Sequence, residues 1–261
     1  MKHGILSFLM CTLCTPWAKA QTTEPMVTDR PDQTESPFLV PIAHVQIEAG
    51  VAQFTTKNSV ADQYTSSLPA VLGRIGLMEF AELRIGGNND LLHAEGQDIS
   101  NGYWERSVFA GLKMPIYKGK GDVTRISFIG HIKLESPQET FFDDAGSITL
   151  MPDFRFTVQH SFLPWYALSY NVGCVWETYA DQPHYLYTLS HGFSITDHIG
   201  AFVEIFGQFS RENYAEEHMI DGGFTWMLFD KMQFDASGGI GINEHAPDYF
   251  LSFGYSLRLA L

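Results

Sequence analysis

Hydrophobic and polar residues alternate with a period of two along most of this sequence, most clearly at its C-terminal end. In residues 249–261 every odd-numbered position is apolar, and most even-numbered positions are small or charged: Ser252, Gly254, Ser256, Arg258 and Ala260. Successive side chains of a β-strand point to opposite faces, so this stretch predicts a strand with one apolar face. An ordinary strand runs about 5–6 residues, whereas a tilted strand needs about 9–11 to cross a bilayer. This segment is long enough to cross.

The same alternation predicts about twelve strands, with connections that alternate between short and long. The strands are expected at residues 43–54, 69–77, 80–89, 104–117, 123–134, 148–162, 165–178, 184–195, 200–209, 219–228, 232–242 and 249–261. The short connections are 78–79, 118–122, 163–164, 196–198 and 229–231, and stretches such as 55–67, 90–102 and 135–146 form longer loops. Short periplasmic turns and longer external loops on an even number of strands are typical of an outer-membrane barrel.

A soluble sandwich is the alternative, but it gives no reason for the long loops to gather at one end. Closing the sheet also removes the exposed edges that an open sheet of this size would carry. The sequence therefore predicts one all-β domain, a closed antiparallel transmembrane β-barrel with short periplasmic turns and longer extracellular loops. Both ends of the barrel are expected in the periplasm.

The N-terminal residues predict export. Lys2 and His3 precede an apolar run at residues 5–13, and Ala18-Lys19-Ala20 has the small-x-small pattern of a signal-peptide cleavage site. The apolar run is too short for a transmembrane helix. We therefore expect a signal peptide at residues 1–20, a periplasmic lead-in segment at 21–42, and the barrel at 43–261 in the cell outer membrane.

Charge and cysteine content exclude several kinds of site. Removing residues 1–20 takes the formal net charge from −14 to −16, because Lys2 and Lys19 are lost. A chain this acidic is a poor partner for nucleic acid, which needs a basic footprint. Cys174 would be the one remaining cysteine, so neither an internal disulfide nor a cysteine metal cluster is expected.

No catalytic residue, metal or cofactor is expected. A lipid hydrolase of the outer membrane would need Ser and His within hydrogen-bond reach. The adjacent pairs His160-Ser161 and Ser190-His191 lie on predicted strands, where neighbours face opposite sides. The histidines also lack the spacing of metal ligands, so an enzyme is disfavoured.

Three stretches resemble a known family. They are residues 28–37 (TDRPDQTESP), 220–225 (IDGGFT) and 239–250 (GIGINEHAPDYF). In this order they resemble the outer-membrane transporter family described as putative MetA-pathway of phenol degradation. The resemblance implies a β-barrel in the outer membrane with a transport role.

The polar face of the predicted strands would line the lumen, and it carries balanced charge. Seven cationic and seven acidic positions are expected there: Arg74, Arg84, Lys113, Arg125, Lys133, Arg155 and Arg258, with Glu48, Glu82, Asp153, Glu177, Glu204, Asp221 and Asp235. Because an unpaired buried charge is costly, this balance favours ion pairs across the lumen.

Two functions fit these charges and stay open at this point. One is passive uptake or efflux of small solutes, hydrophobic or aromatic ones among them. The other is a non-conducting structural or partner-binding barrel with a salt-bridged lumen. For either, the expected partners are outer-membrane lipid and, during insertion, the barrel assembly machinery.

The lead-in segment suggests how the lumen could be narrowed. Its prolines limit chain freedom, and Asp29, Arg30 and Asp32 would enter from the periplasmic side. At that level the strands bring charged residues together: His44, Glu82, Arg84, Asp235 and Arg258. We hypothesise that the segment pairs with this ring, the alternative being a mobile tether of the kind common at chain termini.

Overall fold

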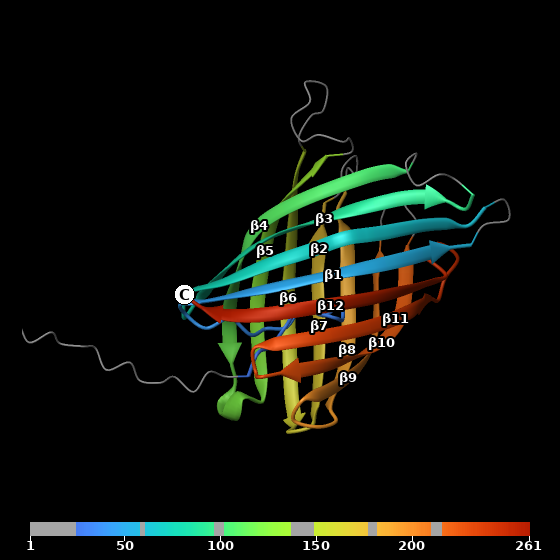
Figure 1. Cartoon of the computed structure of the whole chain (residues 1–261). Helices are drawn as coiled ribbons and strands as arrows, with labels where there is room; N and C mark the ends of the chain where they lie inside the picture. The colour runs from blue at the N-terminus through green and yellow to red at the C-terminus, as the bar shows by residue number, and fades with distance from the viewer. Residues whose placement is uncertain (1–24, 58–60, 97–101, 137–148, 177–181, 210–215) are drawn as a thin grey trace, which may run out of the picture.

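The computed structural model describes residues 25–57, 61–96, 102–136, 149–176, 182–209 and 216–261. The described residues form one closed barrel in which each strand pairs antiparallel with the next and the first pairs with the last (Figure 1). Its twelve strands are β1 (His44–Thr56), β2 (Gln63–Met78), β3 (Ala81–Ala94), β4 (Tyr103–Lys118), β5 (Thr124–Ser136), β6 (Thr149–Leu163), β7 (Tyr166–Val175), β8 (His184–Ser194), β9 (Ile199–Phe209), β10 (Glu217–Leu228), β11 (Met232–Gly241) and β12 (Tyr249–Ala260). The predicted fold class is therefore confirmed. The predicted signal peptide lies outside the described residues.

Alternation along the strands gives the barrel an apolar outside and a polar inside. On β1, Ile47 and Val51 are each 42% exposed on the outer face, whereas Gln46 and Glu48, the residues on either side of Ile47, are buried inside. The same alternation holds across the closing pair on β12, where Phe253 is exposed on the outside. An apolar outer face and a polar interior are the arrangement of a transmembrane barrel. No helix in the described part of the chain is long and apolar enough to span a membrane.

The strands extend further into the polar connections than the sequence pattern predicted. Residues 63–67 and 90–94 were expected in loops, but Gln63 pairs with Ala94 and Ser67 with Asp90, so β2 and β3 continue through them. Backbone pairing does not require apolar side chains, and periodicity marks only the part of a strand that faces lipid. Pro69 lies in the register shift between Ser67 and Ala70, which is one of the few places where a sheet accommodates proline.

The short connections lie at the end of the barrel where the first strand begins and the last one ends. His44 pairs with Ala260 there, next to the turn between β2 and β3. The turn between β4 and β5 contains a 3-10 segment, η2 (Lys120–Asp122). By the usual polarity of outer-membrane barrels this is the periplasmic end.

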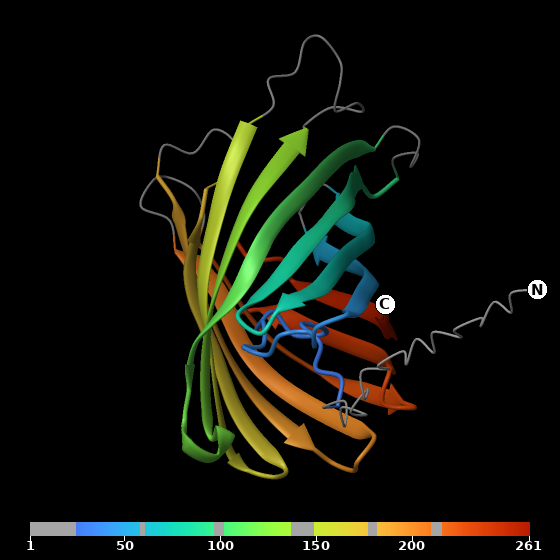
Figure 2. The same cartoon turned by 90° about the vertical axis from the view of Figure 1, so that its left-hand side faces the viewer.

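Residues 25–43 lie inside the barrel, in the space that the strands enclose (Figure 2, blue). They are called the lead-in from here on. Several of their side chains are buried, among them Asp29, Thr34 and Ser36. The C-terminal end of the lead-in contacts β2, where Ile42 forms an isolated β-bridge with Gly76. A Cβ atom at Gly76 would lie 2.1 Å from the carbonyl oxygen of Pro41, so this approach requires glycine.

Candidate functional site in the barrel lumen

Two sides of the lumen differ in charge: cations gather on one side, where Glu48, Glu82 and Asp153 pair with them, and the other side carries carboxylates. Arg74 of β2, Arg84 of β3, Lys113 of β4 and Arg155 of β6 form what we call the basic wall. Glu204 of β9, Asp221 of β10 and Asp235 of β11 form the acidic wall. The lead-in passes between the two walls, and its own charged side chains form ion pairs with residues of both walls.

Asp29 of the lead-in is held by three cations of the basic wall. Its Oδ2 accepts a hydrogen bond from Arg84 Nη1 at 2.6 Å and one from Lys113 Nζ at 2.8 Å, and it lies 3.3 Å from Arg74 Nη1. Its Oδ1 accepts bonds from the backbone N–H and the hydroxyl of Ser36, both at 2.8 Å. Burial alone would raise the pKa of the Asp29 carboxyl, but Arg74, Lys113 and Arg84 hold it well below its ordinary value.

Glu35 gives the basic wall a second carboxylate. Its Oε2 accepts a hydrogen bond from Arg84 Nη2 at 2.8 Å, and its Oε1 lies 3.3 Å from Arg155 Nη1. Asn171 of β7 binds the backbone of the same residue twice, accepting from Glu35 N at 2.7 Å and donating to Glu35 O at 3.0 Å. Burial would raise the pKa of Glu35, but Arg84 and Arg155 lower it overall.

Backbone groups of the lead-in are also bound by side chains of the wall. Arg74 Nη2 donates to the carbonyl of Phe38 at 2.7 Å, and Lys113 Nζ donates to that of Ser36 at 2.8 Å. Glu82 Oε2 accepts from the N–H of Val40 at 2.7 Å. A segment buried without secondary structure needs such partners, so the lumen surface is built to receive this one.

Arg30 points the other way, into a slot at the closing pair of strands. Its Nη2 lies 3.1 Å from Asp235 Oδ1 and donates to Ser252 Oγ at 3.0 Å. Gly50 of β1 and Gly254 of β12 pair directly beneath it. A Cβ atom at either glycine would lie 2.3 Å from an atom of the Arg30 guanidinium group. The slot exists because both positions lack a side chain.

Asp32 lies on the acidic side, where no cation among the described residues forms an ion pair with it. Burial, and then the nearby Glu204 carboxylate, raise the pKa of Asp32 well above its ordinary value. Glu204 accepts hydrogen bonds from the N–H of Gln33 at 2.7 Å and from the hydroxyl of Thr34. It pairs across strands with Asp221, whose side-chain oxygens are buried and have no hydrogen-bond partner within the described part of the chain. This side of the lead-in is therefore less firmly held than the Asp29 side.

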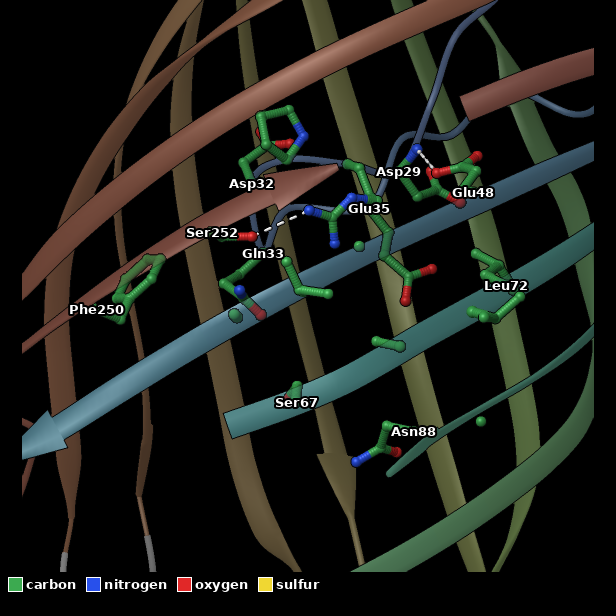
Figure 3. Close-up of a pocket in the computed structure, with 18 of the residues that line it drawn as sticks. Asp29, Asp32, Gln33, Glu35, Glu48, Ser67, Leu72, Asn88, Phe250 and Ser252 are labelled. Carbon is green, nitrogen blue, oxygen red and sulfur yellow. Dashed lines mark hydrogen bonds between the residues drawn. The ribbon is translucent and has the colours of Figure 1, made fainter. Parts of the chain in front are cut away.

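Cavities lie on both sides of residues 30–32. The extracellular-side cavity has a volume of about 340 Å³ and is lined by Phe54, Leu72, Asn88, Phe109 and Phe250 together with lead-in residues (Figure 3). The periplasmic-side cavity, of about 400 Å³, reaches the short turns at Leu163, Pro164 and Ser194. Arg30, Pro31 and Asp32 line both cavities, so they form the partition between them.

Four more of the predicted lumen residues lie at or beside this site. Glu48 accepts bonds from Arg74 Nη1 at 2.9 Å and from the N–H of Asp29 at 2.8 Å, while Asp153 pairs with Arg155 at 2.8 Å. Arg125 lies over the ring of Phe38, 4.4 Å from its centroid. Arg258 donates to Gln46 Oε1 at 2.9 Å. Glu177 lies outside the described residues.

The sequence interpretation omitted several residues of the site. Glu35 and Asn171 bind within it, and the Nε of Arg84 donates to His131 Nε2 at 3.0 Å. His131 and Asn171 occupy inward positions of predicted strands, so the alternation could have identified them. Glu35 lies in the aperiodic lead-in, where the sequence carries no comparable signal.

The described residues contain no group of three or more His, Cys, Asp or Glu side chains that could hold a metal ion. His160 Nδ1 lies 2.9 Å from Thr124 Oγ1, and His191 Nδ1 lies 2.9 Å from Tyr166 Oη. Both histidines lie on the outward face of their strands, away from the lead-in. The chemistry available at the lumen site is charge pairing and hydrogen bonding.

Comparison with known proteins gives one family match. The model of the family described as "Putative MetA-pathway of phenol degradation" matches residues 28–259. No curated protein matches this sequence.

Solved structures share the fold at low sequence identity. The COG4313 outer membrane channel from Pseudomonas putida F1 is similar with a TM-score of 0.65 and 11% identity, over 88% of this chain and 99% of that one. The beta domain of the Bordetella autotransporter BrkA gives a TM-score of 0.51 and 12% identity, over 82% and 99%. The CymD monoaromatic hydrocarbon channel gives 0.48 and 8%, over 84% and 90%. The predicted location in the outer membrane is confirmed by this shared fold together with the apolar outer face.

Proposed function

The chain belongs to the family of putative MetA-pathway of phenol degradation proteins, and we propose that it is an outer-membrane channel whose lumen is closed by its own lead-in. Displacement of the lead-in opens a passage for small solutes by passive diffusion. The observation that carries the proposal is the partition: the same three residues, Arg30, Pro31 and Asp32, line the cavities on both sides. Removing them joins the two cavities.

The lead-in is suited to act as a plug because the hydrogen bonds that hold residues 29–40 each involve a side chain, whereas its backbone bridge from Ile42 to Gly76 lies at the end that continues into β1. It contributes no strand to the barrel, so its release breaks hydrogen bonds and ion pairs but none of the pairing between strands. The strands on either side of it remain a closed sheet. A barrel of this size lies between small barrels filled by side chains and the wide sixteen-stranded pores, so an internal segment can close it.

The lining of the extracellular-side cavity supports solutes with an apolar or aromatic body. Phe54, Phe109 and Phe250 line it together with Leu72, whereas Asn88, Ser67 and Ser252, with the charged side chains of Glu48, Arg84 and the lead-in, form its polar lining. In sites for small organic molecules, apolar and aromatic side chains hold the body of the ligand and polar groups fix its orientation. The description of the family, which names phenol degradation, fits this class of solute.

The test is to delete residues 21–37 while retaining residues 1–20 for export. We expect the deletion protein to show larger single-channel currents than the full chain and to admit small apolar and aromatic solutes in a liposome swelling assay. Migration that changes on heating in a denaturing gel would show that the deleted protein still forms a barrel. A folded deletion protein with no conductance and no swelling would refute the channel and leave the structural, partner-binding barrel.

A further inference from the structure

We propose that the basic wall is a binding site for the carboxylate of an organic acid, which displaces the lead-in by taking the place of Asp29. The inference rests on the proposed plug and adds the chemical class of solute that releases it. In the closed state the site is filled by a carboxylate of the protein itself, and this shows what the site can bind.

The geometry around Asp29 is that of a built anion site. Three cations converge on one carboxylate oxygen, from Arg84 at 2.6 Å, Lys113 at 2.8 Å and Arg74 at 3.3 Å. The side chains of all three are at most 1% exposed. Charge-assisted hydrogen bonds of this kind are the strong ones, and guanidinium groups match carboxylate geometry. The cations lie on three adjacent strands, and Arg74 and Arg84 are also held by Glu82 of the wall.

Lys113 determines the sign of the ligand that the vacated site would take. Arg74 and Arg84 keep ion pairs with Glu82 of the wall when the lead-in leaves. Every side-chain hydrogen bond that the described residues give Lys113 goes to the lead-in, to the carboxylate of Asp29 and the carbonyl of Ser36. Glu82 lies opposite Lys113 on β3 and stays when the lead-in leaves, but among the described residues the three cations Arg74, Arg84 and Lys113 then face two carboxylates, Glu48 and Glu82. The vacated site therefore favours an incoming anion and disfavours an amine.

The space beside the site gives the size of the rest of the ligand. Asp29, Glu35 and Arg84 border the extracellular-side cavity, whose apolar side chains include Leu72 and Phe109. Asp29, Glu35 and Leu72 are labelled in Figure 3. A dry cavity of about 150 Å³ is enough to bind benzene, and this one measures about 340 Å³. An acid with a ring-sized apolar body can therefore direct its carboxylate to Lys113 and its ring to the apolar side.

The acidic wall adds selection against the reverse orientation. Glu204, Asp221 and Asp235 occupy the other side of the lumen, where a second carboxylate would meet like charge. Specificity in such sites comes from repulsion as well as attraction. The two walls together orient a monocarboxylate in one direction.

Benzoate, benzyl alcohol and benzylamine test the inference because they share a ring and differ in charge. Thr34 of the lead-in is buried and forms a hydrogen bond with Glu204. In a protein with the changes Thr34→Cys and Cys174→Ser, the thiol at position 34 is buried while the lead-in is docked. Its rate of reaction with a water-soluble maleimide therefore measures release of the lead-in. At constant ionic strength we expect benzoate to accelerate labelling at least about tenfold, in a saturable way, because a ligand shifts an equilibrium by its differential affinity. Benzyl alcohol and benzylamine should leave the rate within about twofold.

Lys113→Gln in the same background removes the decisive cation. Because Lys113 also holds Asp29, we expect faster labelling without benzoate and a maximal acceleration by benzoate about tenfold smaller, as for loss of one charged hydrogen bond. Lys118→Gln is the matched control, because Lys118 is 60% exposed in a turn and pairs with Asp122. It should leave the benzoate response unchanged. Heat-modifiable migration identifies the variants that form a barrel.

Three outcomes would overturn the inference. Equal acceleration by benzoate and benzyl alcohol would mean that the ring alone acts. Equal acceleration by benzoate and inorganic phosphate would mean that any anion acts through charge. No acceleration by benzoate in the protein with an unmodified basic wall would mean that the site does not admit a carboxylate. Failure of the proposed channel is distinguishable, because the labelling assay needs no conductance and the deletion of residues 21–37 needs no ligand.

Discussion

Replacing Asp29 by asparagine is the sharpest perturbation of the closed state. The amide has nearly the shape of the carboxylate, and its oxygen can still accept from Ser36, but the negative charge that three cations share is lost. The change acts on the docked lead-in alone, because a released Asp29 has only water around it. The basic wall itself is unaltered.

The magnitude follows from the burial of the partners. Removing one member of a buried ion pair costs about 3–5 kcal/mol, because a charge is left uncompensated. If that cost falls on docking, the ratio of open to closed lumens rises by about two to three and a half powers of ten, at 1.4 kcal/mol for each. A lumen closed in the full chain would then be open for a measurable fraction of the time.

Single-channel recording in planar bilayers measures this fraction directly. We expect Asp29→Asn to raise the open probability at least a hundredfold, towards that of the protein lacking residues 21–37. Asp122→Asn is the matched control, since Asp122 also pairs with two cations, Lys118 and Arg125, each at 3.1 Å, but in an exposed turn. Exposed pairs contribute about 0–1 kcal/mol, so this variant should conduct like the full chain.

The reasoning fails if Asp29→Asn forms a heat-modifiable barrel with the currents of the full chain. That result would mean that Asp29 contributes no net free energy to docking. It would also remove the basis for a carboxylate site in the basic wall, because the three cations would then bind a neutral group equally well.

Three further outcomes are expected. Gly254→Ala should raise the open probability about tenfold, because the new Cβ atom would lie 2.3 Å from Arg30 Nε, whereas Gly192→Ala, whose nearest neighbouring atom is 3.9 Å away, should not change it. Because docking raises the pKa of Asp32, protonation of this carboxyl stabilises the docked lead-in at low pH. This stabilisation is lost as the pH rises from the ordinary pKa of 3.8 through the raised pKa of the docked state. Currents should therefore grow with pH, and Asp32→Asn should make them less dependent on pH. Detergent-solubilised protein should give β-type circular dichroism and heat-modifiable migration, and a monodisperse protein soluble without detergent would contradict the fold.

Most of the fold could be predicted because the polarity of the residues in each strand alternates with the side, lipid or lumen, that their side chains face. A position that faces lipid must be apolar and its neighbour faces the lumen, so segments such as 249–261 identify themselves. The strand ends could not be predicted in the same way. Residues 63–67 and 90–94 pair outside the apolar band, where polar side chains are equally suited to a loop.

The candidate site could be predicted only in part, for a related reason. Alternation assigns Arg74, Arg84 and Glu204 to the lumen, but it does not say which of them meet. Ion pairing depends on how strands are arranged around the barrel and on the path of the lead-in, which has no period. The separation into a basic and an acidic wall, and the burial of Asp29 between Arg84 and Lys113, required the three-dimensional arrangement.

The slot for Arg30 links the closed lumen to the order in which the protein is assembled. Half of the slot is Gly50, on the first strand, and the other half is Gly254, on the last, and Arg30 bonds Ser252 across a separation of 222 residues. An unfinished sheet, in which these two strands have not met, has no place for the guanidinium group. The lead-in is therefore among the last segments to dock, and its docking marks a barrel that is already complete.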